Sequence, residues 1–143
     1  MRKKLLGAIG VLSVLFLAIL AVYALTIDDD VGIQTNGTDV QADTVLTFPN
    51  GSIWRFSNIS LTAGNTTVLD MLNAVASKGN FTVETTYYGQ YDSLLVDAIA
   101  GIENGQDDNY WLYWINGDYA SVGADRQPVR TGDTVEWRFT TYG

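Results

Sequence analysis

The sequence predicts an α+β domain, rich in strands and with one main packed helix, behind an N-terminal transmembrane helix. Three observations support this prediction. Residues 5–25 contain no charged side chain. Residues 68–76 carry apolar side chains at helical spacing, and residues 134–140 alternate polar and apolar side chains as a half-buried strand does.

Residues 1–26 are predicted to be a signal-anchor or a signal peptide. Arg2, Lys3 and Lys4 precede the uncharged run. A signal peptide needs about 7–15 apolar residues and a membrane-spanning helix about 20, so the length favours an uncleaved anchor. Val22-Tyr23-Ala24 offers a cleavage site that would instead release a secreted domain. In both cases the basic residues stay in the cytoplasm and the rest of the chain lies outside it.

Residues 27–43 are predicted to form an acidic linker. They include Asp28-Asp29-Asp30 but few large apolar side chains, so the segment cannot bury enough surface to order itself. The alternating oxygen ligands and the fixed glycine of a calcium loop are absent, which favours a solvated spacer. The remaining residues, 44–143, suffice for one domain of about 100 residues.

The first half of this domain shows two short strands and a helix. Residues 45–48 and 53–56 are predicted strands on either side of the turn Pro49-Asn50-Gly51-Ser52. Thr67 and Asp70 have the spacing of a capping-box variant, and Gly79 is the predicted C-terminal stop. The apolar stripe of the helix consists of Val68, Leu69, Leu72, Val75 and Ala76.

The second half alternates strands and turns. Residues 81–86 and 94–99 are predicted strands, and Tyr87 to Tyr91 is predicted to connect them. The last strand places Val135, Trp137 and Phe139 on one face, which we expect to pack on the helix.

The stretch from Tyr110 to Ile115 is apolar or aromatic at every position. Asn116-Gly117 follows it and suits a two-residue type I′ turn, because both residues tolerate a positive φ. Residues 118–122 are the predicted returning strand. A strand that buries one face alternates apolar and polar residues, so this strand is either covered on both sides or leaves one aromatic row open to a ligand. Aromatic rows are more often core.

The composition excludes several classes of function. The chain has no cysteine and no histidine, which removes disulfides, Cys/His metal sites and nucleophiles activated by histidine. The adjacent acids Asp107 and Asp108 would point apart, and no phosphate-binding glycine loop is present. We therefore expect no catalytic or metal site and no enzyme. Beyond residue 4, five basic residues oppose sixteen acidic ones, a net charge of −11 that would repel nucleic acid.

Five sequons for N-glycosylation occur, and all of them precede residue 101. Their acceptors are Asn36, Asn50, Asn58, Asn65 and Asn80. If glycans are attached there, the C-terminal part of the domain remains the surface open for contact.

From Gly101 onward the sequence resembles the transcobalamin-like C-terminal domain family, a module that is also the second domain of intrinsic factor and transcobalamin. The matching residues are Gly101-Ile102, Asn104-Gly105, Tyr110-Trp111, Asn116-Gly117, Ser121 to Asp125, Pro128 and Gly132 to Phe139. The resemblance covers roughly residues 45–139. It implies a β-grasp-like mixed sheet with one main packed helix.

In the cobalamin carriers of this family, the module closes over one face of the corrinoid. The resemblance implicates Trp111, Leu112 and Tyr113 by position, and Leu112 stands where the carriers place a glutamine. With the neighbouring aromatic residues, the candidate ligand-binding set is Tyr110, Trp111, Leu112, Tyr113, Trp114 and Tyr119. The carriers hold the other face with a large helical barrel, for which this chain has no room. A corrinoid such as cobalamin would therefore bind weakly or need a partner chain.

These observations predict a membrane-tethered, non-enzymatic module outside the cytoplasm that binds a corrinoid or a similar amphipathic ring. A second hypothesis is a cell-surface structural or interaction module, whose hairpin contacts an envelope protein, a transporter or a glycan.

Overall fold

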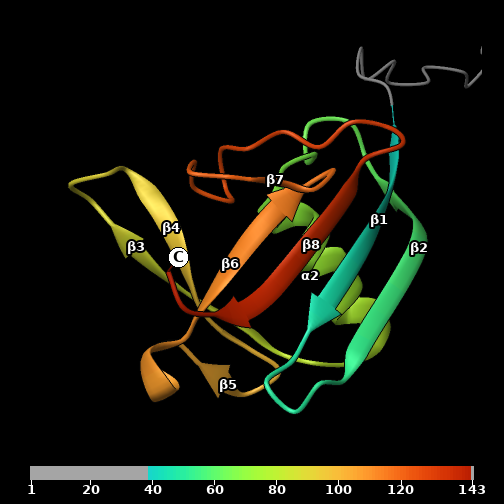
Figure 1. The fold of residues 1–143 in the computed structure, drawn as a ribbon. Coiled ribbons are helices and arrows are strands. Elements are labelled where there is room, and N and C mark those ends of the chain that lie inside the picture. Colours follow the sequence, from blue (N-terminus) through green and yellow to red (C-terminus); the bar gives the residue numbers. More distant parts are fainter. Residues whose placement is uncertain (1–38, 143) are drawn as a thin grey trace, which may run out of the picture. The chain divides into compact units, whose positions relative to one another are not determined.

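The structure is a computed structural model that describes residues 39–142 (Figure 1). These residues belong to one compact unit, Asn36–Gly143. The predicted segment 1–26, most of the predicted linker and the sequon at Asn36 lie outside the described residues. Within the described part of the chain, no helix is long and apolar enough to cross a membrane.

The larger of two sheets has five strands in the order β2-β1-β8-β6-β7. Their bounds are Val40–Thr47 for β1, Ile53–Leu61 for β2, Tyr110–Ile115 for β6, Asp118–Tyr119 for β7 and Thr134–Thr140 for β8. β1 pairs parallel with β8, and all other neighbours are antiparallel, so the sheet is mixed. In Figure 1, β6, β8 and β1 cross the centre of the molecule and the helix α2 lies behind them. This confirms the α+β class with one main packed helix.

β1 begins earlier than the sequence predicted. It starts at Val40, inside the range expected for the linker, because Val40 and Ala42 pair with Leu61 and Ile59 of a longer β2. The start of β1 and the end of β2 have a polar residue at every second position, so the sequence did not predict them as strand. This alternation is nevertheless typical of a strand at the edge of the core.

The helix α2 (Val68–Gly79) has the predicted N-terminus. The Thr67 side chain accepts from the Asp70 N–H at 3.2 Å, and the Asp70 carboxylate accepts from the Thr67 N–H at 2.9 Å. At the other end, Gly79 is the last helical residue rather than the stop, and Asn80 takes the left-handed cap with φ of 54°. A Cβ at Gly79 would lie 2.9 Å from the rings of Phe56 and Phe81, so the glycine serves close packing.

The smaller sheet has the strands β3 (Val83–Tyr88), β4 (Ser93–Ile99) and β5 (Ile102–Glu103), in the order β3-β4-β5. β3 continues through Tyr88, so two of the five residues of the predicted connector are strand. A short 3₁₀ turn, η1 (Gln106–Asp108), leads to β6. Figure 1 shows the β3–β4 hairpin extending away from the five-stranded sheet on the side of β6.

The turn after β6 is formed as predicted, but the returning strand is shorter. Asn116 and Gly117 have φ of 52° and 88°, as a type I′ turn requires. The Asn116 side chain also accepts from the Thr134 N–H and donates to Asp133, each within 2.9 Å, which ties the turn to the start of β8. β7 ends at Tyr119, and the chain then leaves the sheet.

One hydrophobic cluster joins the helix to both sheets. Val135 and Trp137 of β8 are buried in it with the stripe of α2, and half-buried Phe139 packs against it, so the predicted face of β8 is confirmed. The largest fully buried side chains are Trp137, Leu46, Met71, Leu72, Ile99, Val68, Val75, Val135 and Thr44.

Candidate functional site

β6 divides its aromatic residues between two environments. Trp111 and Tyr113 are buried in the core, where the Trp111 ring lies 5.5 Å from Phe48 and the Tyr113 ring 5.1 Å from Trp137. The Trp111 indole N–H donates to the Ile102 carbonyl at 2.8 Å. Both residues therefore belong to the hydrophobic core.

The alternate residues of β6 are on the opposite side of the sheet. Trp114 is half-buried under the guanidinium of Arg138, whose central carbon lies 4.4 Å from the ring centroid. Glu136 bonds Arg138 at 2.5 Å, and this hydrogen bond holds the pKa of the Glu136 carboxyl below its usual value. The Tyr110 ring packs against Tyr142 at 5.0 Å. A hollow of about 530 Å³ on this side is lined by Leu112, Trp114, Tyr119, Arg138, Thr140, Thr141 and Tyr142.

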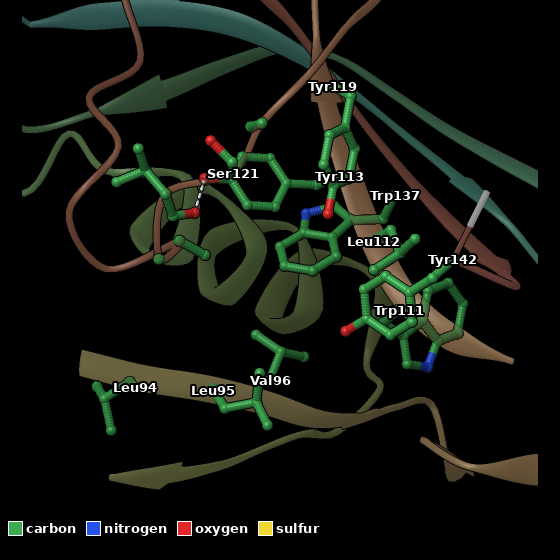
Figure 2. Close-up of a pocket in the computed structure, with 14 residues that line it drawn as sticks. Leu94, Leu95, Val96, Trp111, Leu112, Tyr113, Tyr119, Ser121, Trp137 and Tyr142 are labelled. Carbon is green, nitrogen blue, oxygen red and sulfur yellow. Dashed lines mark hydrogen bonds between the residues drawn. The ribbon is translucent and has the colours of Figure 1, made fainter. Parts of the chain in front are cut away.

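Another concave feature lies on the β4 side of β6. It has a volume of about 210 Å³ and is bounded by β4, β6, the segment 119–124 and the indole of Trp137 (Figure 2). Figure 2 shows Leu95 and Val96 on β4 across the opening from Trp137 and Tyr113. The side chains that line it are mostly apolar or aromatic.

A second hollow of about 520 Å³ shares one wall with the first. The shared residues are Leu94, Leu95, Ser121, Val122 and Gly123. The second hollow adds Tyr88, Tyr91, Ser93 and Arg126. We call the two hollows together the β4–β6 groove. Leu95 and Tyr91 are 45% and 68% exposed, so the groove presents apolar and aromatic surface to solvent.

The wall of the groove after β7 is held by two polar anchors. Asp125 accepts from the Ser93 hydroxyl at 2.6 Å and from the Leu94 N–H at 3.0 Å. The Tyr113 hydroxyl donates to the Val122 carbonyl at 2.5 Å. A side chain at Gly123 would collide with Ser93 and Asp125, so only glycine lets this segment approach β4 so closely.

The surroundings of Asp125 and Tyr113 favour the protonation state that each needs for its hydrogen bonds. Burial opposes the charge of Asp125, but the hydrogen bonds from Ser93 and from backbone N–H groups, together with the charge of Arg126, outweigh it and lower the pKa of this carboxyl. Burial raises the pKa of Tyr113 to about 12, so its hydroxyl remains a donor. Neither group has the shift that would suit a general acid or base near neutral pH.

The structure brings together four of the six candidate ligand-binding residues. Trp111, Leu112, Tyr113 and Tyr119 line the β4–β6 groove, whereas Trp114 lines only the hollow on the other side of the sheet and Tyr110 lines neither. Of the four, Tyr119 has the most exposed side chain. In the described residues, no group of three or more acidic side chains could hold a metal ion.

Sequence reasoning missed the opposite wall. The sequence predicted that Leu94, Leu95 and Val96 belong to an ordinary buried strand and that Trp137 belongs to the core, but all four residues line the groove. Tyr88 and Tyr91 read as a connector. The dense run of tyrosines was the one available signal, because large aromatic side chains seldom gather in a solvated turn without a partner.

The four described sequon asparagines lie away from this groove. Asn50, Asn58, Asn65 and Asn80 are exposed, and none of them lines it. Whether they carry glycans stays a prediction.

Comparison with known proteins gives one family and a shared fold. Residues 65–141 match the family described as "Domain of unknown function (DUF4430)". No curated protein sequence matches the chain. Haptocorrin in complex with Cbi is similar in structure, with a TM-score of 0.64 at 16% identity over 75% of this chain. The chain spans 26% of the length of haptocorrin.

A proposed metal-binding protein from Ruminococcus gnavus ATCC 29149 has a TM-score of 0.54 at 17% identity. That similarity covers 73% of this chain and 99% of the other. At such identities the likeness concerns the fold, which is transcobalamin-like, as the sequence resemblance implied.

Proposed function

Since the chain belongs to the DUF4430 family, a domain of unknown function, we propose that it is a non-enzymatic ligand-binding module that works outside the cytoplasm on a membrane tether. Its ligand site is the β4–β6 groove. The ligand is a corrinoid or a similar amphipathic ring, and a partner chain covers the face that this module leaves open.

The observation that carries this proposal is the groove itself. An apolar and aromatic concavity with few polar groups at its edge is the usual form of a small-molecule site. It has volumes of about 210 and 520 Å³ in its two parts, and Leu95, Tyr91 and Val122 expose apolar surface along it. The likeness to haptocorrin in complex with Cbi supports a corrinoid as the ligand.

The shape of the groove argues for a partner chain. Ligand pockets normally bury about 70–90% of a drug-sized molecule, and a groove with one open side buries less. The module also corresponds to only 26% of haptocorrin, which leaves most of that protein without a counterpart here. An envelope protein or a transporter subunit would supply the missing wall.

The chemistry of the groove supports binding rather than catalysis. Its ionisable residues are engaged in structure, because Asp125 holds Ser93 and Leu94, and Arg126 pairs with Asp92 at 2.8 Å. Tyr113 is fixed on the Val122 carbonyl. The basic start of the chain and the uncharged run after it support the tether.

Titration with cobinamide tests the proposal. We place the full-length chain in lipid nanodiscs and measure ligand binding by calorimetry, where saturable heat is expected. Leu95→Asp should weaken binding at least tenfold, because it puts a charge on the apolar wall. Ile53→Asp is the matched control, since Ile53 is a similarly exposed aliphatic residue, 50% against 45%, that lines none of the hollows described above.

The corrinoid hypothesis fails if cobinamide gives no saturable heat up to millimolar concentration. The assignment of the ligand site to the β4–β6 groove is wrong if the Leu95→Asp and Ile53→Asp variants bind cobinamide equally well.

A second candidate function is a cell-surface interaction module for a protein or a glycan. The exposure of Tyr87, Tyr88 and Tyr91 on the β3–β4 hairpin favours it. Trp111 and Tyr113 are unsuitable for testing it, because both are buried and their loss would damage the fold. A Tyr87→Ser variant leaves both the core and the groove intact, because Tyr87 is 59% exposed and lines neither hollow of the groove. Loss of one specific envelope partner in pull-downs with this variant, while cobinamide binding persists, would support the second function.

A further inference from the structure

β3 is an outer strand with one edge that no other strand covers. It pairs with β4 on one side, and its other edge faces no strand of the described part of the chain (Figure 1). Five of its six residues, Glu84 to Tyr88, are exposed. The β3–β4 hairpin therefore projects into solvent with one side of its ladder incomplete, and two-stranded hairpins are only marginally stable by themselves.

One hydrogen bond shows which residues of β3 point their backbone groups to this free edge. In an antiparallel ladder, successive residues point their N–H and C=O groups alternately toward the partner strand and away from it. The Ala100 N–H donates to the Thr82 carbonyl at 2.8 Å, so Thr82 points toward β4. Val83 therefore points toward the free edge, and the same alternation turns Thr85 and Tyr87 that way.

The residues of β4 opposite Thr85 and Tyr87 agree with this orientation. The Val96 carbonyl, opposite Thr85, accepts from a side-chain amide beyond β5 at 2.8 Å. The Leu94 N–H, opposite Tyr87, donates to the Asp125 carboxylate at 3.0 Å. β4 thus turns these groups away from β3. Among the described residues, no partner accepts from the N–H groups or donates to the C=O groups that β3 directs outward.

The register shift in the β3–β4 ladder leaves β3 itself regular. Glu84 pairs with Ala98 and Thr85 with Val96, so the extra residue, Asp97, belongs to β4. β3 also contains no proline and no lysine, which commonly protect an edge strand from pairing. Its free edge therefore has the continuous form that can accept another strand.

The sequence of β3 is complementary to itself in one antiparallel register. When Thr85 lies opposite Thr85 of a second copy, Val83 lies opposite Tyr87 and Glu84 lies opposite Thr86. Threonine pairs favourably with threonine, and aromatic residues with β-branched ones. The outward-pointing residues then face one another, so each facing pair exchanges two hydrogen bonds. A register moved by two residues would instead set Glu84 against Glu84, which places like charges opposite each other.

We propose that two copies of this chain associate through β3, antiparallel and with Thr85 opposite Thr85. The two smaller sheets then form one continuous sheet in the order β5-β4-β3-β3-β4-β5. The arrangement has twofold symmetry, which closes the assembly at two copies. This inference goes beyond the proposed function and does not depend on it, because no ligand takes part.

Charge gives this association a recognisable dependence on salt. Beyond residue 4 the chain has a net charge of −11, so two domains repel each other at low ionic strength. Glu84 is the one charged residue in the sequence of β3, and in the proposed register it meets a threonine. Added salt should therefore strengthen the association, whereas it would weaken a contact made by ion pairs.

Cysteine cross-linking of the full-length chain in detergent micelles tests the register. The chain has no cysteine, so a single introduced thiol can pair only with the same position of another copy. Thr85→Cys sets two thiols on facing residues with Cα atoms about 5.5 Å apart, a separation that suits a disulfide. Thr86→Cys is the matched control, because its two copies are diagonal neighbours about 7–8 Å apart. Oxidation with copper phenanthroline should cross-link Thr85→Cys about tenfold faster than Thr86→Cys.

Sedimentation in the same micelles measures the association itself. Thr85→Pro removes an N–H that points to the free edge, so it should leave the ladder with β4 intact and weaken the association about tenfold. Thr85→Val keeps the N–H and the branched shape, and should associate like the parent. Sodium chloride should raise the fraction of dimer in the parent.

Several results would overturn the inference. They are equal cross-linking of the two cysteine variants, faster cross-linking of Thr86→Cys, a parent chain that stays monomeric up to millimolar concentration, and an association that salt weakens or that Thr85→Pro leaves unchanged. The cross-linking comparison decides the matter even where the proline variant does not fold. Cobinamide titration is a separate measurement, so this inference and the proposed function can fail independently.

Discussion

The helix α2 and the strand β4 both pack against the five-stranded sheet, but α2 forms a closed contact and β4 leaves a groove. Where α2 lies on the sheet, Val68, Leu72 and Val75 are fully buried and the contact is closed. Where β4 approaches β6, Val96 is buried but Leu95 is 45% exposed and a groove remains. The closed contact stabilises the domain, and the open contact leaves apolar surface exposed to solvent.

The geometry of the two elements explains the difference. A helix presents a continuous stripe of side chains to a sheet, because positions three and four residues apart lie on one face. A hairpin presents only every second residue, and β4 lies in a separate sheet that shares no hydrogen-bonded ladder with β6. Its approach is set instead by a few polar anchors, of which Asp125 is the most connected.

The largest expected effect on the unfolding free energy is in α2, whose contact with the sheet should contribute more to stability than that of β4. Leu72→Ala should cost about 2–5 kcal/mol of unfolding free energy, since a fully buried leucine leaves a cavity. Leu95→Ala, at the groove, should cost less than about 0.5 kcal/mol because the side chain is exposed. Urea unfolding followed by tryptophan fluorescence measures both. Similar losses would mean that the hairpin packs as tightly as the helix.

Asp125 should have the next largest effect, and it should depend on pH. Asp125→Asn weakens the bonds to Ser93 and Leu94, with an expected loss of about 1–2 kcal/mol at pH 7. The pKa of Asp125 is lower in the folded state, so its stabilisation is complete above the ordinary aspartate pKa of about 3.9 and is lost as the pH falls through the lower, folded value.

The difference in urea midpoint between the parent and Asp125→Asn should therefore be constant from pH 8 to about 5 and shrink in more acidic solution. Asp92→Asn serves as the control for a general loss of one negative charge near the groove. A difference that grows on acidification would rule out this role for Asp125.

The next prediction concerns the Thr44 hydroxyl, a buried polar atom without a hydrogen-bond partner among the described residues. The hydroxyl is fully buried, and Thr44 lines none of the hollows described above. Thr44→Val should therefore raise the unfolding free energy by about 1 kcal/mol, because it removes a buried polar group that has no acceptor. Thermal and urea unfolding check this. A loss of stability would show that the Thr44 hydroxyl bonds to a group in the native protein.

The smallest expected effect is at the rim of the groove. Arg126 and Asp92 form an ion pair at 2.8 Å, but both side chains are largely exposed. Arg126→Ala should change the unfolding free energy by less than about 0.5 kcal/mol, and any effect should fade in 1 M salt. A larger loss in urea unfolding would indicate that this rim, rather than Asp125, fixes the hairpin.

Local patterns predicted the closed part of the molecule well. The capping box of Thr67 and Asp70, the stripe of α2, the Asn116-Gly117 turn and the face of β8 all depend on residues close in sequence. The ends of β1, β7 and α2 were less accurate, because tertiary pairing decides where a strand stops.

The groove could not be predicted in the same way. It brings Leu95, Trp111, Val122 and Trp137 together from four separate segments. Each of these residues is apolar and therefore typical of a core, and only the arrangement in space reveals that the space between them stays open. The resemblance pointed to β6, which forms one wall of the groove, but it carried no information about the wall formed by β4.

The pairing of β1 with β2 contains a β-bulge, which has a consequence for solubility. β2 is the outer strand of the five-stranded sheet, nine residues long, and an edge of that length invites pairing with another copy of the chain. Its register shifts opposite Asp43, where Asn58 takes a left-handed φ of 53° and donates its N–H to the Asp43 carboxylate at 2.8 Å. The edge is thereby broken into two short stretches, neither of which offers a continuous template for aggregation.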